Sequence, residues 1–87
     1  GYYFRILTQQ GTNAPGGAYN YVINGRMIAG FAMLAYPAEY GESGVMTFIV
    51  NHNGAVYERD LGPNTAKLAP TIKAFDPGKG WKPVKPE

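Results

Sequence analysis

The sequence predicts an α+β fold that is mainly β, with an antiparallel sheet of four to five strands and one short C-terminal helix. Three observations lead to this prediction. Short segments alternate apolar and polar side chains with the period of a strand. The chain holds seven Tyr and twelve Gly; aromatic residues suit a pleated, half-buried surface, and Gly suits tight turns. Two Asn-Gly pairs each follow an alternating segment, which is the sequence pattern of a hairpin.

Five segments carry the strand pattern. We predict strands over Tyr2–Thr8, Tyr19–Ile23, Arg26–Tyr36, Val45–Asn51 and Ala55–Asp60. The third contains Gly30 and several Ala between larger apolar residues. This indicates a central strand that is covered on both faces and leaves room for another element. Because neighbouring strands usually pair, we expect a meander of hairpins in this order.

The connections between the strands are predicted from turn-forming residues. Asn24-Gly25 and Asn53-Gly54 predict two hairpin turns, since both residue types reach positive φ readily. The stretch QQGTNAPGGA, residues 9–18, predicts a flexible excursion. Pro37 ends the third strand because proline withholds a backbone donor. An acidic loop, AEYGESG, then leads to the fourth strand.

After the last strand the pattern changes to the period of a helix. Leu68, Ile72 and Phe75 fall at i, i+4 and i+7, which forms one apolar stripe. We therefore predict a short helix near Thr65–Phe75 that packs this stripe on the sheet. Pro70 requires either a late start or a break in the helix, because proline costs about 3 kcal/mol in a helix interior.

Length and composition indicate a single domain, residues 1–87, without disulfides. A chain of 87 residues is too short for two ordinary cores, contains no Cys and has a net charge of +2. No apolar run approaches the roughly 20 residues that cross a bilayer. Trp81 is expected to fold back onto the domain, and the tail KGWKPVKPE, residues 79–87, to be a solvated end. Because the chain opens directly on a strand pattern, we expect a C-terminal fragment of a longer protein.

The residues with chemical potential do not form a catalytic or metal-binding pattern. His52, the only histidine, lies beside the Asn53-Gly54 turn, where we expect it in water without a carboxylate to orient it. Ser43 in GESG lacks the spacing of a nucleophile elbow. Glu39 and Glu42 offer two carboxylates, whereas Ca²⁺ takes six or more oxygens. We therefore predict no catalytic residue, no metal site and no cofactor, and a protein that is not an enzyme.

Aromatic and basic side chains supply the candidates for contact with a ligand or partner. Tyr rings can stack on sugars or bases, but a nucleic-acid platform needs a basic groove, for which three Arg are too few. No nucleic-acid partner is therefore expected. Cross-strand pairing is the commoner reason for such an aromatic composition. The predicted contact residues are Tyr3, Arg5, Tyr19, Tyr21, Arg26 and Tyr57.

Motifs along most of the chain carry a resemblance to a known family. They are GYYFRIL, APGGAY, NGRMI, YPAEYG and VNHNGAVYERDLGP. Residues 1 to about 80 resemble the C-terminal part of the bacterial exported proteins grouped as domain of unknown function 2950. The resemblance implies longer members with an export signal and a preceding helical region, a periplasmic or extracellular location, and no established activity. The strand GFAMLAYP and the following hairpin also resemble, more weakly, the globular sheet of type IV pilins and pseudopilins, so a pilin-like sheet is an alternative.

These observations lead to one functional hypothesis and two alternatives. The leading hypothesis is a non-enzymatic exported structural or interaction module that docks on protein, either its own parent chain or an envelope assembly. The first alternative is a subunit of an extracellular filament, pilin-like or β-stacked, in which an edge strand such as Tyr2–Thr8 pairs with another copy. The second is a ligand-binding module that uses the Tyr residues and the NAPGG loop.

Overall fold

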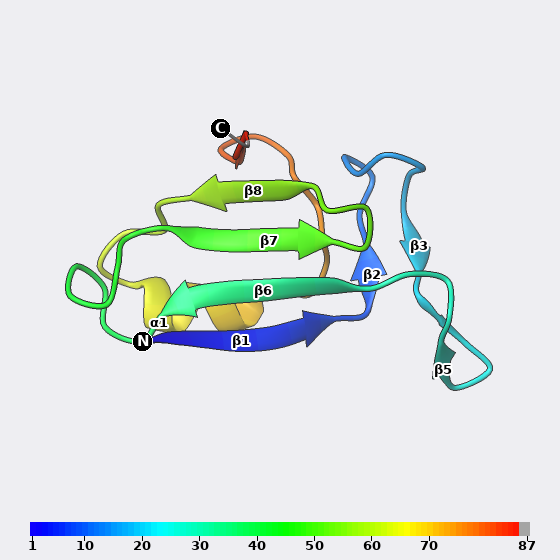
Figure 1. The fold of residues 1–87 in the computed structure, drawn as a ribbon, viewed down its shortest axis with the longest axis horizontal. Helices are drawn as coiled ribbons and strands as arrows, with labels where there is room; N and C mark the ends of the chain where they lie inside the picture. The colour runs from blue at the N-terminus through cyan, green and yellow to red at the C-terminus, as the bar shows by residue number, and fades with distance from the viewer. Residues whose placement is uncertain (86–87) are drawn as a thin grey trace.

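Five strands form one antiparallel sheet in the order β1-β6-β7-β8-β9 (Figure 1). The computed structural model describes residues 1–85. The strands are β1 (Tyr2–Leu7), β6 (Ala32–Pro37), β7 (Thr47–Asn51), β8 (Val56–Arg59) and β9 (Lys82–Pro83). A short helical segment, α1 (Thr65–Leu68) followed by the 3₁₀ helix η1 (Ala69–Thr71), lies behind the sheet in Figure 1. The predicted α+β fold, with an antiparallel sheet and a short helix, is confirmed.

The strand order departs from the expected meander at one place. β1 pairs with β6, with Arg5 opposite Leu34, and not with the segment that follows it in sequence. From β6 onward, consecutive strands do pair as a meander. The departure arises because residues 9–31 leave the sheet and return to it. β1 is an edge of the sheet in the observed order, as it would be in the meander.

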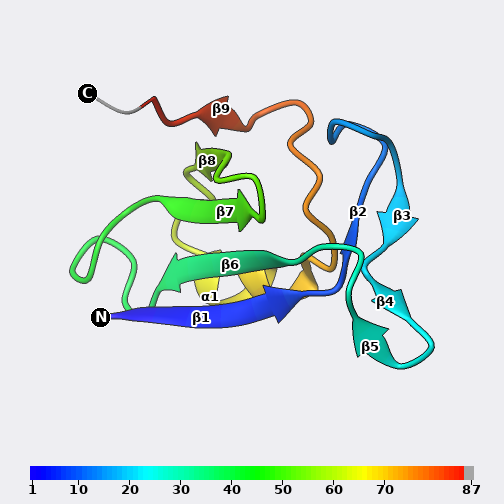
Figure 2. The same ribbon diagram turned by 45° about the vertical axis from the view of Figure 1, so that its right-hand side comes forward.

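Residues 9–31 form an arm of two short ribbons at one end of the sheet (Figure 2). The ribbons are β2 (Gln9–Gln10) with β3 (Tyr19–Asn20), and β4 (Val22–Ile23) with β5 (Arg26–Met27). The continuous strands predicted over Tyr19–Ile23 and Arg26–Tyr36 are therefore wrong in their extent.

Local backbone chemistry explains where these strands break and turn. The Asn20 side-chain oxygen accepts a hydrogen bond from the Val22 N–H at 2.8 Å, an Asx turn that separates β3 from β4. Gly30 has φ +152°, a conformation that favours glycine, between β5 and β6. Asn24 and Gly25 have φ values of 51° and 78°, as the predicted hairpin turn requires.

The second Asn-Gly pair closes the β7–β8 hairpin, as predicted. Asn51 is 5% exposed, and its side-chain oxygen accepts hydrogen bonds from the N–H groups of Asn53 and Ala55, both at 3.0 Å. Gly54 has φ +79°, which glycine adopts without steric cost. A buried side chain therefore stabilises this hairpin together with the turn residues.

The helical segment is shorter than predicted and changes type near Pro70. Pro70 lies in the first turn of η1, where its missing N–H costs no helical hydrogen bond. Ile72 is already extended, with φ −76° and ψ 119°, so Phe75 enters the core from an extended chain. Arg5 on β1 holds the end of the segment from the sheet. Its guanidinium donates hydrogen bonds to the carbonyls of Ala69, Pro70 and Ile72.

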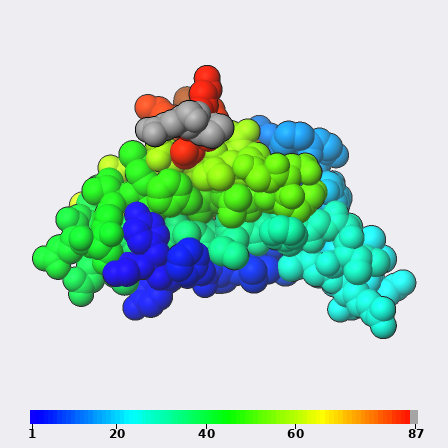
Figure 3. Space-filling model, viewed as in Figure 1, coloured from blue at the N-terminus to red at the C-terminus, as the bar shows by residue number. Residues whose placement is uncertain are grey.

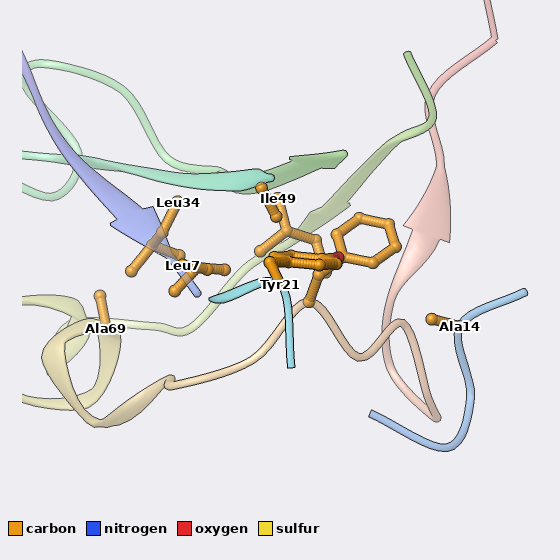
Figure 4. Close-up of a cluster of buried hydrophobic side chains, with 8 residues drawn as sticks. Leu7, Ala14, Tyr21, Leu34, Ile49 and Ala69 are labelled. Carbon is orange, nitrogen blue, oxygen red and sulfur yellow. The ribbon is translucent and has the colours of Figure 1, made fainter. Parts of the chain in front are cut away.

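The core lies between the helical segment and the sheet and continues under the arm (Figure 4). Its buried hydrophobic residues are Leu7, Ala14, Tyr21, Ala32, Leu34, Ile49, Ala69 and Phe75. Phe75 is joined to the arm by two backbone hydrogen bonds, with Gln9 at 2.9 Å and with Gly11 at 3.0 Å. The arm therefore contributes Ala14 and Tyr21 to the same core as the sheet.

The C-terminal segment returns to the sheet as its fifth strand. β9 pairs with β8, with Lys82 opposite Glu58, and Trp81 packs against the core as predicted. Part of the predicted solvated tail is therefore a strand, although the side chains of β9 are exposed. The last two residues of that tail, Pro86 and Glu87, lie outside the described residues. Within residues 1–85, no helix has the length and apolar character needed to cross a membrane.

Candidate binding surface

One face of the sheet carries apolar side chains and is left uncovered by the helical segment. Side chains alternate between the two faces along each strand, and Leu7, Leu34 and Ile49 point to the core. Their strand neighbours point the other way. Figure 3 views this side, where β1, β6, β7 and β8 form the surface. We call it the open face; its apolar members are Tyr2, Phe4, Ile6, Met33, Ala35, Phe48, Val50 and Val56.

The strand register arranges these side chains in rows across the sheet. One row is Ile6, Met33, Val50 and Val56, and the next is Phe4, Ala35, Phe48 and Glu58. Phe4 is 68% exposed and Ile6 is 50% exposed. Charged side chains lie at the β8–β9 edge of the sheet, where Lys82 on β9 lies opposite Glu58 on β8. An apolar surface with a charged margin can bind another apolar surface and set its orientation.

The apolar residues of the open face can be recognised in the sequences of its strands. Tyr2, Phe4 and Ile6 make one face of β1 apolar, while the other face carries Tyr3, Arg5 and Leu7. On β7, Phe48 and Val50 likewise form an apolar face, while Ile49 lies on the core face between the buried polar residues Thr47 and Asn51. An apolar second face favours burial, but the sequence of these strands does not say what covers it.

The six predicted contact residues do not form one surface. Tyr3 on β1 is exposed and its ring contacts that of Tyr36, with 5.5 Å between the ring centroids. Arg26 is exposed on β5 in the arm. The ring of Tyr57 on β8 meets that of Phe75 at 5.9 Å and is partly buried. The structure therefore places these three residues at separate points of the molecule.

The other three predicted contact residues differ in what they offer to a ligand. Arg5 is occupied by the carbonyls at the end of η1, and Tyr21 is fully buried. Tyr19 is 38% exposed and lines a groove of about 460 Å³ together with Gln9 and Asn20. Of these three, Tyr19 is the one whose ring remains available for contact.

Tyr21 is the centre of a buried polar cluster that organises the arm. Its hydroxyl donates a hydrogen bond to Gln10 Oε1 at 3.0 Å. Gln10 Nε2 in turn donates to the carbonyls of Pro15 at 2.9 Å and Gly17 at 2.7 Å. These hydrogen bonds join Tyr21 through Gln10 to the backbone of the loop that contains NAPGG, so the cluster holds the loop against the arm.

His52 lies beside its turn as predicted and is partly exposed, with its ring packed against neighbouring aromatic rings. Its ring meets that of Tyr21 edge-on at 5.7 Å and that of Phe31 at 6.0 Å. The Phe31 N–H donates to Nδ1 at 3.2 Å. A Cβ at Gly30 would come within 2.6 Å of the imidazole, so this glycine leaves room for the ring. Aromatic rings and backbone groups therefore position His52, which is an arrangement for packing.

The Tyr21 hydroxyl makes the stability of the domain sensitive to alkaline pH. Burial raises the pKa of Tyr21 above its usual value of 10.0, and Tyr19 raises it further. The unfolded chain therefore loses this proton first as the pH rises. The contribution of the group to stability is complete below pH 10.0 and is lost as the pH rises toward the folded-state pKa.

We expect the Tyr21→Phe variant to be less stable at neutral pH and less sensitive to alkali. Gln10 Oε1 loses its buried donor, which should lower the free energy of unfolding by about 1–3 kcal/mol at pH 7. Above pH 10 the variant should lose less further stability than the unsubstituted chain. Urea unfolding at a series of pH values measures both effects, with the exposed Tyr3→Phe as the control. Parallel pH profiles for Tyr21→Phe and the unsubstituted chain would contradict this account.

The acidic and histidine side chains of the described residues do not assemble a metal centre. Within residues 1–85, no group of three or more His, Asp or Glu side chains lies close enough to hold a metal ion. Tyr40 donates a hydrogen bond to Asp60 Oδ1 at 2.7 Å, and this hydrogen bond raises the pKa of Tyr40, which is partly exposed. The pair joins the acidic loop to the end of β8, so it has a structural role.

The comparison with known families classifies the chain. The family described as "Protein of unknown function (DUF2950)" matches residues 1–84. The chain belongs to the DUF2950 family. The family resemblance carried by the sequence motifs is thereby confirmed for this DUF2950 chain. No curated protein and no solved structure matches it, and the likeness to pilin sheets remains a prediction.

Proposed function

We propose that the chain is a non-enzymatic exported interaction module that docks a partner protein through the open face. One observation supports this proposal above the others. Phe4 and Ile6 are 68% and 50% exposed on an apolar sheet face that the helical segment leaves uncovered. Burying such surface contributes about 25 cal/mol per Å². Contiguous exposed apolar surface on a soluble domain typically marks an interaction site.

The dimensions of the open face favour a narrow partner element. β1 and β6 are six residues long, which is about 20 Å at 3.3 Å per residue, and four neighbouring strands span about 14 Å. Ala35 lies between Phe4 and Phe48 in its row, so a small side chain separates two rings. An amphipathic helix, about 10 Å wide, fits an area of this size. We therefore expect the partner to present an apolar helical stripe.

We place this module in the periplasm or outside the cell. This part of the proposal rests on the resemblance of its motifs to exported proteins. Fractionation of the native cells, with detection of the chain in the periplasmic and secreted fractions, is the measurement that checks it. Recovery in the cytoplasmic fraction alone would contradict export.

Site-specific photocrosslinking tests the docking proposal. A benzophenone amino acid in place of Phe4 should give an adduct of defined mass when native cells are irradiated. The same group at the exposed Lys67 on α1 is the matched control and should not give that adduct. Ile6→Asp, which charges the open face, should abolish the Phe4 adduct without unfolding the domain, because Ile6 is half exposed. Equal crosslinking from both positions, or an adduct that persists in Ile6→Asp, would contradict docking at this face.

A second candidate function, a filament subunit, is favoured by the position of β1. This strand forms an edge of the sheet and is rich in aromatic and aliphatic residues. An edge strand can pair through its backbone with a strand of another copy. Electron microscopy of native material should then show filaments, and a field of dispersed particles alone would exclude this candidate.

A further inference from the structure

A cavity of about 430 Å³ lies on the helix side of the sheet, away from the open face. Its walls include Arg59, Leu61, Leu68, Ile72, Lys73 and Trp81. These residues come from the end of β8, from the helical segment and the chain that follows it, and from the approach to β9. A volume of about 300–1,000 Å³ is usual for a small-molecule site. The cavity, which we call the Trp81 cavity, is therefore large enough for a compact ligand.

The apolar walls of the Trp81 cavity are held in place by the core. Leu61, Ile72 and Trp81 are partly buried and pack against the core cluster. Leu68 is 45% exposed at the cavity and has no place in that cluster. Three walls are thus packed against the core without a ligand, and an apolar ligand would cover Leu68 as well, which is exposed. Such preorganisation lowers the entropic cost of binding.

The side chains that line the cavity carry a net positive charge. Arg59 and Lys73 line it, and so does the carboxylate of Asp76. That carboxylate is engaged elsewhere, because its Oδ1 accepts hydrogen bonds from the Asn13 backbone and side-chain nitrogens, both at 2.9 Å. Its Oδ2 faces Gly11, where an added Cβ would lie 2.4 Å away. An incoming ligand therefore meets two cations and a carboxylate that is turned toward the arm.

Arg59 is the better suited of the two cations to hold a carboxylate. A Cβ added to Gly80 would lie 3.1 Å from the Arg59 Cζ, so the guanidinium rests against the backbone just before Trp81. A planar guanidinium can take both oxygens of a carboxylate in a bidentate pair, which an ammonium such as that of Lys73 cannot do. Arg59 and Trp81 both line the cavity, so a carboxylate receptor and an aromatic side chain belong to the same site.

We infer that the Trp81 cavity binds a small amphipathic carboxylate, a molecule with one carboxylate on an apolar chain or ring. The carboxylate pairs with Arg59, and the apolar body lies against Leu61, Leu68 and Trp81. Lys73 adds to the attraction of the negative charge. This inference does not rest on the docking proposal, because the cavity and the open face use different residues.

Titration of the chain with three eight-carbon probes tests this inference. Trp81 is the only tryptophan in the sequence, so its fluorescence reports on the cavity. Octanoate should change this fluorescence saturably, with a Kd of about 1 mM or tighter for a ligand of this size. Neutral 1-octanol and cationic octylamine should bind at least about tenfold more weakly, since they lack the carboxylate. Equal responses to the three probes, or a response to octanoate that does not saturate, would overturn the inference.

Matched variants assign the effect to the cavity. Arg59→Gln should weaken octanoate binding about tenfold and leave the octanol response unchanged, because it removes the guanidinium alone. Lys67→Gln removes an exposed cation of α1 that is not among the cavity-lining residues, and it should leave octanoate binding unchanged. Ile6→Asp on the open face should also leave it unchanged. Octanoate binding that survives Arg59→Gln, or is lost in Ile6→Asp with the fold intact by circular dichroism, would contradict the site.

Discussion

Replacing Phe75 with Ala is expected to lower the free energy of unfolding by about 3–5 kcal/mol. Phe75 is fully buried, its ring meets that of Tyr57 at 5.9 Å, and its backbone is bonded to Gln9 and Gly11 of the arm. The substitution therefore leaves a cavity where the sheet, the arm and the C-terminal segment meet. A domain of this size has a net stability of roughly 5–10 kcal/mol, so the variant should be largely unfolded in mild denaturant.

Urea unfolding followed by circular dichroism measures this loss. Phe4→Ala is the matched control, since it removes the same ring from a position that is 68% exposed. The control should change the free energy of unfolding by no more than about 0.5 kcal/mol. Unfolding of the two variants at the same urea concentration would contradict the account in which the Phe75 side chain holds the sheet, the arm and the C-terminal segment together.

The second large effect is expected from Arg5. Its guanidinium bridges β1 to the carbonyls of Ala69, Pro70 and Ile72, and its Nε is buried without a hydrogen-bond partner. In Arg5→Met the stem still packs, but three carbonyls lose a charged donor. We expect the free energy of unfolding to fall by about 2–4 kcal/mol, because hydrogen bonds to charged groups contribute about 1.5–3 kcal/mol each and do not add fully.

Arg5→Lys separates the geometry of the guanidinium from its charge. A single ammonium cannot reach the three carbonyls in the same way, so Lys should recover less than half of the loss. Arg26→Met removes an exposed arginine of the arm and should have little effect. The free energies of unfolding of these variants in urea provide the measurement. Full stability in Arg5→Met would show that β1 and η1 are held together by packing alone.

The turns and the division of the helical segment were predictable from the sequence because they depend on the backbone preferences of a few neighbouring residues. Asn24-Gly25 and Asn53-Gly54 turn the chain where predicted, since their backbone preferences need no tertiary partner. Pro70 divides the helical segment for the same reason: the missing N–H belongs to the residue itself. The type of each long strand also followed from its own side chains.

The pairing of strands was not predictable in the same way. The stretch Arg26–Tyr36 has the composition of one long strand, but Gly30 at φ +152° and the packing of His52 beside it divide the stretch. β9 holds only a Lys-Pro pair with little strand preference, and its pairing with β8 depends on where Trp81 is packed. In both cases, tertiary contacts and not the strand preferences of the residues determine where the strands form and how they pair.

The candidate sites were less accessible to sequence reasoning than the fold. The Tyr and Arg residues were predicted as contacts because their side chains can stack on or pair with a ligand. In the structure, Tyr21 and Arg5 instead make hydrogen bonds within the fold. The Trp81 cavity joins residues on both sides of the helical segment, and no local pattern brings Arg59 to Trp81. The spacing of residues along the chain does not carry this information.

The pairing of β1 with β6 has a consequence for the chain as it is synthesised. The loop between these strands spans residues 8–31, whereas β6, β7 and β8 are joined by shorter connections. Closing a longer loop costs more entropy, and contacts between distant segments form later. During synthesis β1 therefore lacks its partner strand β6 until residues 32–37 have emerged from the ribosome. We expect this interval to be when the polypeptide most needs a chaperone.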